Sequence, residues 1–203
     1  MPKKCRICRR ERAKLYLKGE RCFSPKCPID KKGGVPPGDH GLRSSLRLSG
    51  FGTQLRGKQK IKRYYGLRER ELKNYFLSAE SLAGQPEENL VRLLEARLDN
   101  VVYRLGFAPS RAASKQLIAH GQVKVNDQKV TIPSYQVRPK DRVELSAKAA
   151  NLVHIKSWLE KKDINIPVWL AKKGLIGKVG KEPEVKDWPA DLDPGLVIEY
   201  YSR

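Results

Sequence analysis

The sequence predicts an α+β fold, with a mainly helical body, a basic N-terminal arm, and a module of two helices and a small antiparallel sheet. Two observations carry this prediction. Over residues 49–105, apolar residues recur at three- and four-residue steps, the period of amphipathic helices. After residue 121 the period changes to two, and turn-forming residues separate short alternations, which indicates strands. A chain of 203 residues is long enough for one or two domains.

The first 45 residues are predicted to form a basic arm that holds all four cysteines. Cys5 and Cys8 are separated by two residues, and Cys22 and Cys27 by four. Two close pairs joined by a short segment suit tetrahedral thiolate coordination, so we predict a metal site with zinc as the first choice. An iron–sulfur cluster on the same residues stays open as the alternative. Residues 30–41, rich in Lys, Gly and Pro, are predicted to be an extended linker or strap.

The charge of the chain points to a polyanionic partner. Lys and Arg number 42 against 22 Asp and Glu, a formal net charge of +20. The first 75 residues contain 22 of those cations and 6 of those acids, so they carry +16 of the total. Basic residues bind polyanions because neutralised phosphates release counterions. RNA is favoured over a membrane surface, since no amphipathic helix with bulky apolar residues accompanies the charge. Without an apolar span or a secretory signal, we expect a cytoplasmic protein with reduced cysteines.

The helical body is predicted to span residues 46–86. The apolar series is interrupted at Gly66, which divides it into two helices. Cations leave one face of the first helix apolar, so we predict a core helix with a basic exterior. The aromatic side chains of Tyr64, Tyr75 and Phe76 could stack on bases, but we predict that they belong to the core.

The module begins near Pro86, which suits the first position of a helix. The stripe from Leu90 to Leu105 predicts one helix that stops at Gly106. A second helix is predicted from Ser110, its N-cap, to about Gly121. Its N-terminal backbone N–H groups, together with the basic side chains Arg111 and Lys115, predict a phosphate site.

Strands follow these helices. Val123–Val125 and Val130–Ile132 are predicted as a hairpin around a turn at 126–129, and Val143–Leu145 as a third strand. Further on, the sequence predicts a helix from Ala149 to Lys161, with Leu152, Ile155 and Leu159 in register. Extended pieces are predicted at Ile166–Trp169 and Gly177–Val179. A loop over 182–194 and a last strand or extended clip at Leu196–Tyr201 are predicted to follow.

Several of these residues together resemble the alpha-L RNA-binding module. They are Arg97-Leu98-Asp99, Ser110-Arg111, Gln116-Leu117-Ile118, Gly121, Val123 and Val125-Asn126. That module occurs in a small-subunit ribosomal protein, in some pseudouridine synthases, in tyrosyl-tRNA synthetases and in a heat-shock RNA-binding protein. The segment Gln54–Gly66, the motif Glu69–Phe76, the cysteine arm and the ending Leu196–Arg203 resemble the bacterial small-subunit ribosomal protein S-four family. The resemblance covers nearly the whole chain, with Gly57 and Asp127 as departures.

The resemblance implies a body of residues 46–86 joined by the tail 187–203, and a module with its extension over 87–186. It implies a structural ribosomal protein that binds small-subunit (16S) ribosomal RNA as a primary binder, nucleates assembly of the subunit body and contributes to decoding accuracy. Some members of the family repress their own operon. The implied partners are that RNA, the neighbouring ribosomal protein S-five and messenger RNA near the entry channel. No membrane partner and no homo-oligomer are expected.

The predicted RNA-binding residues lie in the body and in the module. They are Arg43, Arg47, Arg56, Lys58, Lys60, Lys62, Arg63, Arg70, Lys73, Arg97, Ser110, Arg111, Ser114, Lys115, Gln116, His120, Lys124 and Asn126. An enzyme is not predicted. Asp99 stands in a context similar to that of pseudouridine synthases, but Asn100-Val101 does not continue their signature, and no second carboxylate, nucleophile–base pair or Gly-rich phosphate loop is evident. We expect Asp99 to pair with a cation such as Arg97, Arg92 or Arg104.

Overall fold

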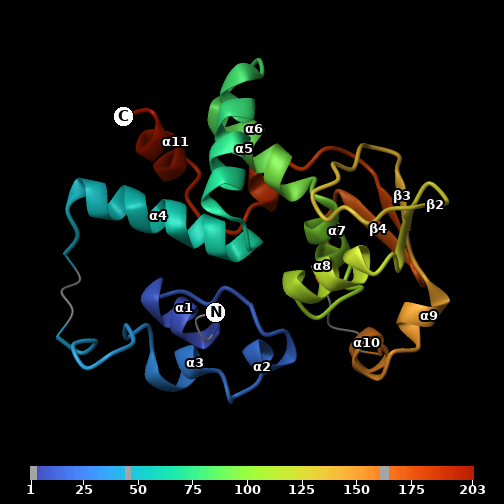
Figure 1. Ribbon diagram of the computed structural model, residues 1–203, viewed down its shortest axis with the longest axis horizontal. Coiled ribbons are helices and arrows are strands. Elements are labelled where there is room, and N and C mark those ends of the chain that lie inside the picture. Colours follow the sequence, from blue (N-terminus) through green and yellow to red (C-terminus); the bar gives the residue numbers. More distant parts are fainter. Residues whose placement is uncertain (1–3, 44–46, 161–164) are drawn as a thin grey trace. The chain divides into compact units, whose positions relative to one another are not determined.

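The computed structural model describes residues 4–43, 47–160 and 165–203. The chain divides into two compact units: unit 1 comprises Met1–Leu90 and Pro189–Arg203, and unit 2 comprises Val91–Trp188. Unit 1 is therefore built from both ends of the chain, and unit 2 from the continuous segment that lies between those ends in the sequence (Figure 1). The predicted boundary between arm and body, at residue 45, lies outside the described residues. None of the helices in the described ranges is long and apolar enough to cross a membrane.

Unit 1 is helical in its described parts. Its elements are α1 (Lys4–Arg10), α2 (Glu20–Phe23), α3 (Pro28–Lys32), α4 (Gly50–Tyr65), α5 (Glu69–Ser81), the first half of α6 (Pro86–Glu95) and α11 (Gly195–Tyr201). The Ser49 side chain caps α4 by accepting from the Gly52 N–H, and Gly66 ends it at a φ of 63°. This confirms the predicted division of the body into two helices. The buried side chains include Ile61, Tyr65 and Phe76.

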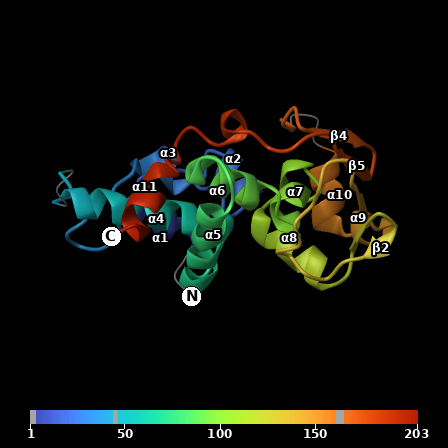
Figure 2. The same ribbon diagram turned by 90° about the horizontal axis from the view of Figure 1, so that it is seen from above.

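The tail is a helix, so the strand or extended clip predicted for Leu196–Tyr201 is wrong. Helix α11 lies along α4, as both views show (Figures 1 and 2). The apolar residues fit a helix because Val197, on the side that packs, is fully buried. Leu196 sits over Gly57, where an added Cβ atom would lie 2.5 Å from the Leu196 Cδ1 atom. Gly57 therefore permits the close approach of the two helices.

The arm is more ordered than an extended strap. Residues Pro28–Lys32 are helical, so the predicted extended character of residues 30–41 begins only after Lys32. Arg9 of α1 then fixes the segment that follows: its Nε donates to the Val35 carbonyl at 2.8 Å and its Nη2 to the Pro36 carbonyl at 3.2 Å. These bonds hold the Pro-rich segment against α1.

Unit 2 packs helices against one face of a five-stranded antiparallel sheet. Its elements are the second half of α6, α7 (Leu98–Arg104), α8 (Arg111–Ala119), β1 (Val123–Val125), β2 (Gln128–Lys129), β3 (Arg142–Leu145), α9 (Ala147–Ala150), α10 (Val153–Leu159), β4 (Leu170–Lys173), β5 (Ile176–Val179) and the 3-10 turn η1 (Val185–Asp187). The strand order is β2-β1-β3-β5-β4. Val123, Val143 and Val179 of the sheet join Leu105 and Ile118 of the helices in one buried core.

The single helix predicted from Pro86 to Leu105 is wrong, because the chain breaks between α6 and α7. Arg97 is extended, with φ −64° and ψ 135°, and forms a β-bridge with Gln136. The backbone N–H groups that open α7 donate elsewhere, from Leu98 to the Tyr135 carbonyl and from Asp99 to the Pro133 carbonyl. This pairing with a segment far along the chain overrides the continuous apolar stripe.

The hairpin turn is tighter than predicted. Asn126 and Asp127 have φ angles of 50° and 67°, the two positive values of a two-residue type I′ turn. Pairing therefore starts at once, and the second strand is Gln128–Lys129 rather than Val130–Ile132. Ile132, predicted to lie in a strand, is instead 60% exposed.

The helix predicted from Ala149 to Lys161 is two short helices, α9 and α10. Leu152 stands between them with an extended backbone as the N-cap of α10, and it is exposed rather than in the core. Lys161 lies outside the described residues. The extended piece predicted at Ile166–Trp169 is displaced, because β4 starts at Leu170, whereas the piece predicted at Gly177–Val179 falls within β5.

Candidate RNA interface

The start of α8 is built around its N-cap. The Ser110 hydroxyl accepts a hydrogen bond from the Ala113 N–H, which satisfies one of the free donors at the helix end. Ser114 donates its own hydroxyl to the Ser110 carbonyl at 3.3 Å. Both serines are buried. They fix the direction in which the next residue, Arg111, leaves the helix.

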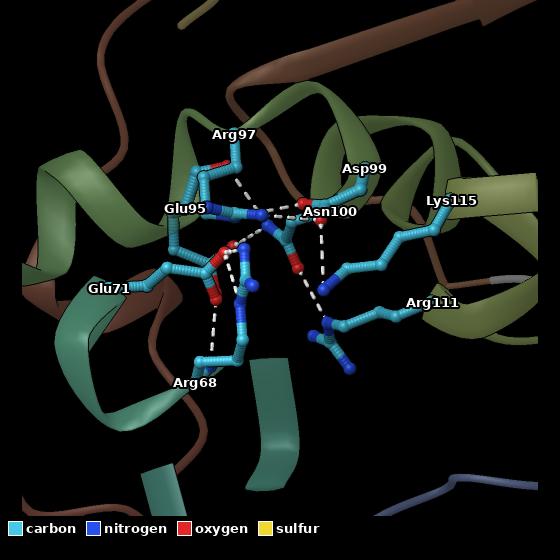
Figure 3. A network of polar contacts seen from close by, with 8 residues as sticks. All are labelled: Arg68, Glu71, Glu95, Arg97, Asp99, Asn100, Arg111 and Lys115. Atoms are coloured by element: carbon cyan, nitrogen blue, oxygen red, sulfur yellow. Dashed lines mark hydrogen bonds and ion pairs between the residues drawn. The ribbon is translucent and has the colours of Figure 1, made fainter. Parts of the chain in front are cut away.

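A network of buried charges lies beneath this helix start. Arg97 donates to both carboxylate oxygens of Asp99, at 3.0 and 2.7 Å. Lys115 of α8 places its Nζ 3.6 Å from the same carboxylate (Figure 3). Asp99 is 1% exposed and Arg97 3% exposed. The expectation that Asp99 pairs with a nearby cation is confirmed for Arg97.

The two other cations considered for Asp99 are used elsewhere. Arg104 donates to both oxygens of the buried Glu95, at 3.1 and 2.9 Å. Arg92 pairs with Glu182 at 3.1 Å. The Glu95 carboxylate also accepts from the Asn100 amide at 2.8 Å. A buried carboxylate needs this number of donors because an unpaired buried charge is strongly destabilising.

Asn100 links this cluster to Arg111. Its Oδ1 accepts from the Arg111 Nε at 2.8 Å, while its amide donates to Glu95 (Figure 3). The Arg111 guanidinium also lies over the Tyr103 ring, 4.4 Å from the centroid. The side chain that the sequence assigned to a phosphate is thus largely engaged inside unit 2. Lys115, whose side chain is 29% exposed, is the more accessible cation of the pair.

The predicted RNA-binding residues divide by exposure. The buried ones are Lys58, Arg97, Ser110, Arg111 and Ser114, and the half-buried ones are Arg56, Lys60, Lys62, Arg63 and Lys115. The exposed ones are Arg43, Arg47, Arg70, Lys73, Gln116, His120, Lys124 and Asn126. RNA contact by each of them stays a prediction. The exposed residues of α8, β1 and the segments directly after them lie in unit 2, and those of α5 and of the segment before α4 lie in unit 1.

The cations of α4 are fixed by two carboxylates that sequence reasoning did not single out. Arg56 and Arg63 both donate to the Oε1 of the buried Glu11 in the segment after α1. Burial raises the pKa of Glu11, and the two guanidinium groups oppose that rise. A lone Glu in a basic arm belongs to no recognisable motif, so no local signal would have identified it.

Glu69 is the second such carboxylate. It accepts from Lys58, from Lys62 at 2.7 Å, and from the Tyr201 hydroxyl of α11 at 2.7 Å. Burial disfavours its ionised form, but these hydrogen bonds outweigh burial and lower the pKa of Glu69 to about 2. Lys58 also lies 4.0 Å from the centroid of the Tyr200 ring. These five residues are referred to below as the tail clasp.

The four cysteines line one pocket of the arm. Cys8, Cys22 and Cys27 are buried, Cys5 is half-buried, and all four are free thiols. The Lys18 backbone N–H donates to the Cys22 sulfur at 3.3 Å, a contact that also stabilises metal-bound thiolates. Burial raises the pKa of Cys8 and Cys22, and the other thiolates raise it further. A cation would relieve that repulsion, so the donor set fits a thiolate-bound metal.

The arrangement of the thiols is not that of a closed coordination sphere. Within the described ranges, no group of three or more His, Cys, Asp or Glu side chains is gathered tightly enough to hold a metal ion. The four thiols are neighbours around one pocket, and metal coordination by them remains a prediction.

Comparison with known proteins gives matches along nearly the whole chain. The family model described as "Ribosomal protein S4/S9 N-terminal domain" matches residues 2–95, and the "S4 domain" model matches residues 96–143. The chain is 47% identical to small ribosomal subunit protein uS4 of Azoarcus sp. over 203 residues, which cover 98% of this chain and 97% of the relative. It is 48% identical to uS4 of Thermosipho africanus and 46% identical to uS4 of Thermus thermophilus, in each case over 98% of this chain and 96% of the relative.

Proposed function

Because the chain belongs to the family of small ribosomal subunit protein uS4, we propose that it binds 16S ribosomal RNA directly and early, and so nucleates assembly of the body of the small subunit. The chain is a small-subunit ribosomal protein with an S4 RNA-binding domain, and it is not an enzyme. Its place is therefore the ribosome of the cytoplasm.

The observation that carries this proposal is the exposure of polar and basic side chains within the S4 domain. Lys124 is exposed on β1, and Gln116 and His120 are exposed at α8 and its C-terminal end. The buried network behind them holds α7 and α8 together, so these side chains extend from a fixed support. Polar and basic side chains on a rigid helix and hairpin can contact RNA phosphates and read the shape of a folded RNA.

Footprinting on small-subunit ribosomal RNA tests the proposal. The full chain should protect one compact set of nucleotides at a helix junction, before other proteins are added. A Lys124→Ala variant should lose protection there while keeping its fold, with a Lys148→Ala variant as the control of equal charge. Equal protection by all three proteins would place the RNA site elsewhere on the molecule.

Further roles follow the same family resemblance. We propose contacts with the neighbouring protein S-five and with messenger RNA near its entry channel, and through them a contribution to decoding accuracy. Exposed cations of unit 1, such as Arg43 and Arg70, support the contact with messenger RNA. Repression of the operon that encodes the chain is proposed as well. It predicts that the leader of that messenger competes with 16S RNA for one binding site, and independent, simultaneous binding of both would contradict it.

A metal is proposed for the arm. Cys5, Cys8, Cys22 and Cys27 would hold a zinc ion, or alternatively an iron–sulfur cluster, and the metal would tie both ends of the intervening loop together. Support comes from the pocket that the four thiols share and from the hydrogen bond that the Lys18 backbone N–H donates to the Cys22 sulfur. Because cysteine binds metal as the deprotonated thiolate, acid or a chelator should release the metal. Elemental analysis of protein purified under reducing conditions decides the matter, and protein without zinc or iron would refute the proposal.

A further inference from the structure

The sheet of unit 2 has a solvent-facing side that is rich in lysine. Side chains on strands alternate between faces, and the other face packs on the helical core through residues such as Val123, Val143 and Val179. The strand register places the remaining side chains together on the outer side. We call this side the basic sheet face; its members are Lys124, Lys129, Arg142, Glu144, Ala171, Lys173, Ile176 and Lys178.

Two pairs of like charges stand directly opposite each other on this face. Lys124 on β1 is the register partner of Lys129 on β2. Arg142 on β3 is the register partner of Lys178 on β5. Like charges at directly opposed positions destabilise a sheet. The charge of Arg142 is balanced by its ion pairs with Asp127 and Glu144, whereas an anion bound over Lys124 and Lys129 would relieve the repulsion between those two lysines.

Two acids on and beside this face stand against five cations, so they do not neutralise it. Glu144 is the register partner of Lys124, but the ion pairs of both acids are with Arg142, through Asp127 at 2.9 Å and Glu144 at 2.9 Å. In the parts of the chain that the structure describes, Lys124, Lys129, Lys173 and Lys178 form no ion pair, and all four are exposed. Four lysine ammonium groups thus remain available across the sheet.

Half of these lysines lie outside the S4 domain match. That match ends at residue 143, whereas Lys173 and Lys178 belong to β4 and β5. Strand β5 pairs with β3 and β4 pairs with β5, so the hairpin extends the sheet by two strands. At a strand spacing of about 4.8 Å, the five strands present a face roughly 19 Å wide. The β4–β5 hairpin therefore adds area and charge to the side of the domain that already presents Lys124.

We infer that the basic sheet face is a second RNA-contacting surface, in which Lys173 and Lys178 of the β4–β5 hairpin bind backbone phosphates of the same ribosomal RNA. The inference rests on the proposed function and assigns this hairpin a role in it. RNA is favoured over an acidic protein because protein interfaces are depleted in lysine, whereas lysine is a usual ligand of phosphate. Ile176, 38% exposed on β5 between its register partners Glu144 and Lys173, offers an apolar contact for a ribose or base.

A salt titration of RNA binding tests this inference in the full chain. The Lys173→Ala/Lys178→Ala variant is compared with Lys148→Ala/Lys156→Ala, which removes the same charge from exposed positions on α9 and α10. Each phosphate that the variant can no longer neutralise should reduce the slope of log affinity against log salt by about 0.7–0.9, so the hairpin variant should show a slope that is smaller by about 1.4–1.8. The control should keep the wild-type slope.

Thermal unfolding gives an independent readout. Lys173 and Lys178 are exposed and form no ion pair among the described residues, so the hairpin variant should unfold close to the wild-type temperature, even though it binds RNA less tightly. If the hairpin variant showed both a smaller salt slope and a lowered melting temperature, the inference would be overturned, because damage to the fold would then explain the weaker RNA binding.

Two further outcomes separate the alternatives. If the hairpin variant and its control share the wild-type slope, the basic sheet face does not bind RNA. If, in addition, a cross-linker at position 178 captures a neighbouring protein in assembled subunits, the face is a protein contact, which also overturns the inference. A wild-type chain without preference for small-subunit RNA would instead refute the proposed function itself.

Discussion

Asp99 holds two elements of unit 2 together through one carboxylate. It accepts from Arg97 ahead of α7 and faces Lys115 on α8, and it is 1% exposed. Asp99→Asn leaves the buried Arg97 without a counter-charge, so we expect it to lower the free energy of unfolding by about 3 kcal/mol or more. Urea denaturation measures this. Asp127→Asn, which removes an exposed partner of Arg142, is the control and should unfold like wild type.

Arg111 and Lys124 should respond differently to the same substitution. Arg111→Ala removes a buried hydrogen bond to Asn100 and the contact with the Tyr103 ring, so we expect a decrease of about 2 kcal/mol in stability. Lys124→Ala alters an exposed strand position and should leave stability unchanged, while the salt slope of RNA binding falls by about 0.7–0.9. Denaturation and salt titration of both variants check this. Equal stability of the two would show that the Arg111 side chain is not needed inside the unit.

At the scale of elements, the tail clasp joins α11 to α4 and α5 through groups that titrate at opposite ends of the pH range. The pKa of Glu69, about 2, lies below its ordinary value of 4.5. The contribution of Glu69 to the free energy of unfolding is therefore complete above about pH 4.5 and is lost as the pH falls toward 2. Burial and the bond to Glu69 raise the pKa of Tyr201 above its ordinary value of 10.0. The tyrosine contribution is therefore complete below pH 10 and is lost as the pH rises above it.

Tyr201→Phe isolates the alkaline part of this behaviour. Without the hydroxyl, stability at neutral pH should fall by about 1 kcal/mol, and the further decrease above pH 10 should be smaller than in wild type. The acid-side decrease should persist, because Lys58 and Lys62 still hold Glu69. Unfolding free energies measured from pH 3 to pH 11 give the loss at neutral pH, the decrease above pH 10 and the decrease on the acid side. Tyr200→Phe keeps the ring over Lys58 and is the matched control, expected to follow wild type throughout.

Local sequence signals located most elements but not their tertiary exceptions. Gly66 and Ser110 marked helix ends correctly because caps act through their own neighbours. The break at Arg97 depends on backbone pairing with residues near Gln136, which no window around Arg97 contains. The short apolar run Leu196–Ile198 does not by itself distinguish a strand from a helix, and the packing on α4 decides for a helix.

The same limit applied to the candidate interface. Sequence reasoning found residue types suited to RNA, such as Arg97 and Arg111, but exposure depends on what packs over each side chain. Lys173 and Lys178 were missed because they lie far from the recognisable module along the chain. Only the pairing of β5 with β3 brings them beside it.

At the scale of the whole molecule, the two units should contribute differently to binding. The first 35 residues contain 12 Lys and Arg against 3 acids, and many of these cations, such as Arg6, Lys31 and Lys32, are exposed. Replacing these three by Ala should weaken binding of cognate and scrambled RNA alike. The slope of log affinity against log salt should become smaller by up to roughly 2–2.7. Lys115→Ala/Lys124→Ala should instead reduce the preference for cognate RNA. Parallel salt titrations on both RNAs measure this, and loss of preference in the arm variant would reject the division of roles.

Unit 1 is made from both ends of the chain, whereas unit 2 is one continuous segment. During vectorial synthesis, unit 2 can therefore finish folding as soon as residue 188 has left the exit tunnel. Unit 1 must wait for α11, which follows unit 2 in the chain and supplies Val197 to the core of unit 1 and Tyr201 to the clasp. A nascent chain that stops before α11 would therefore emerge with its S4 domain intact and its body incomplete.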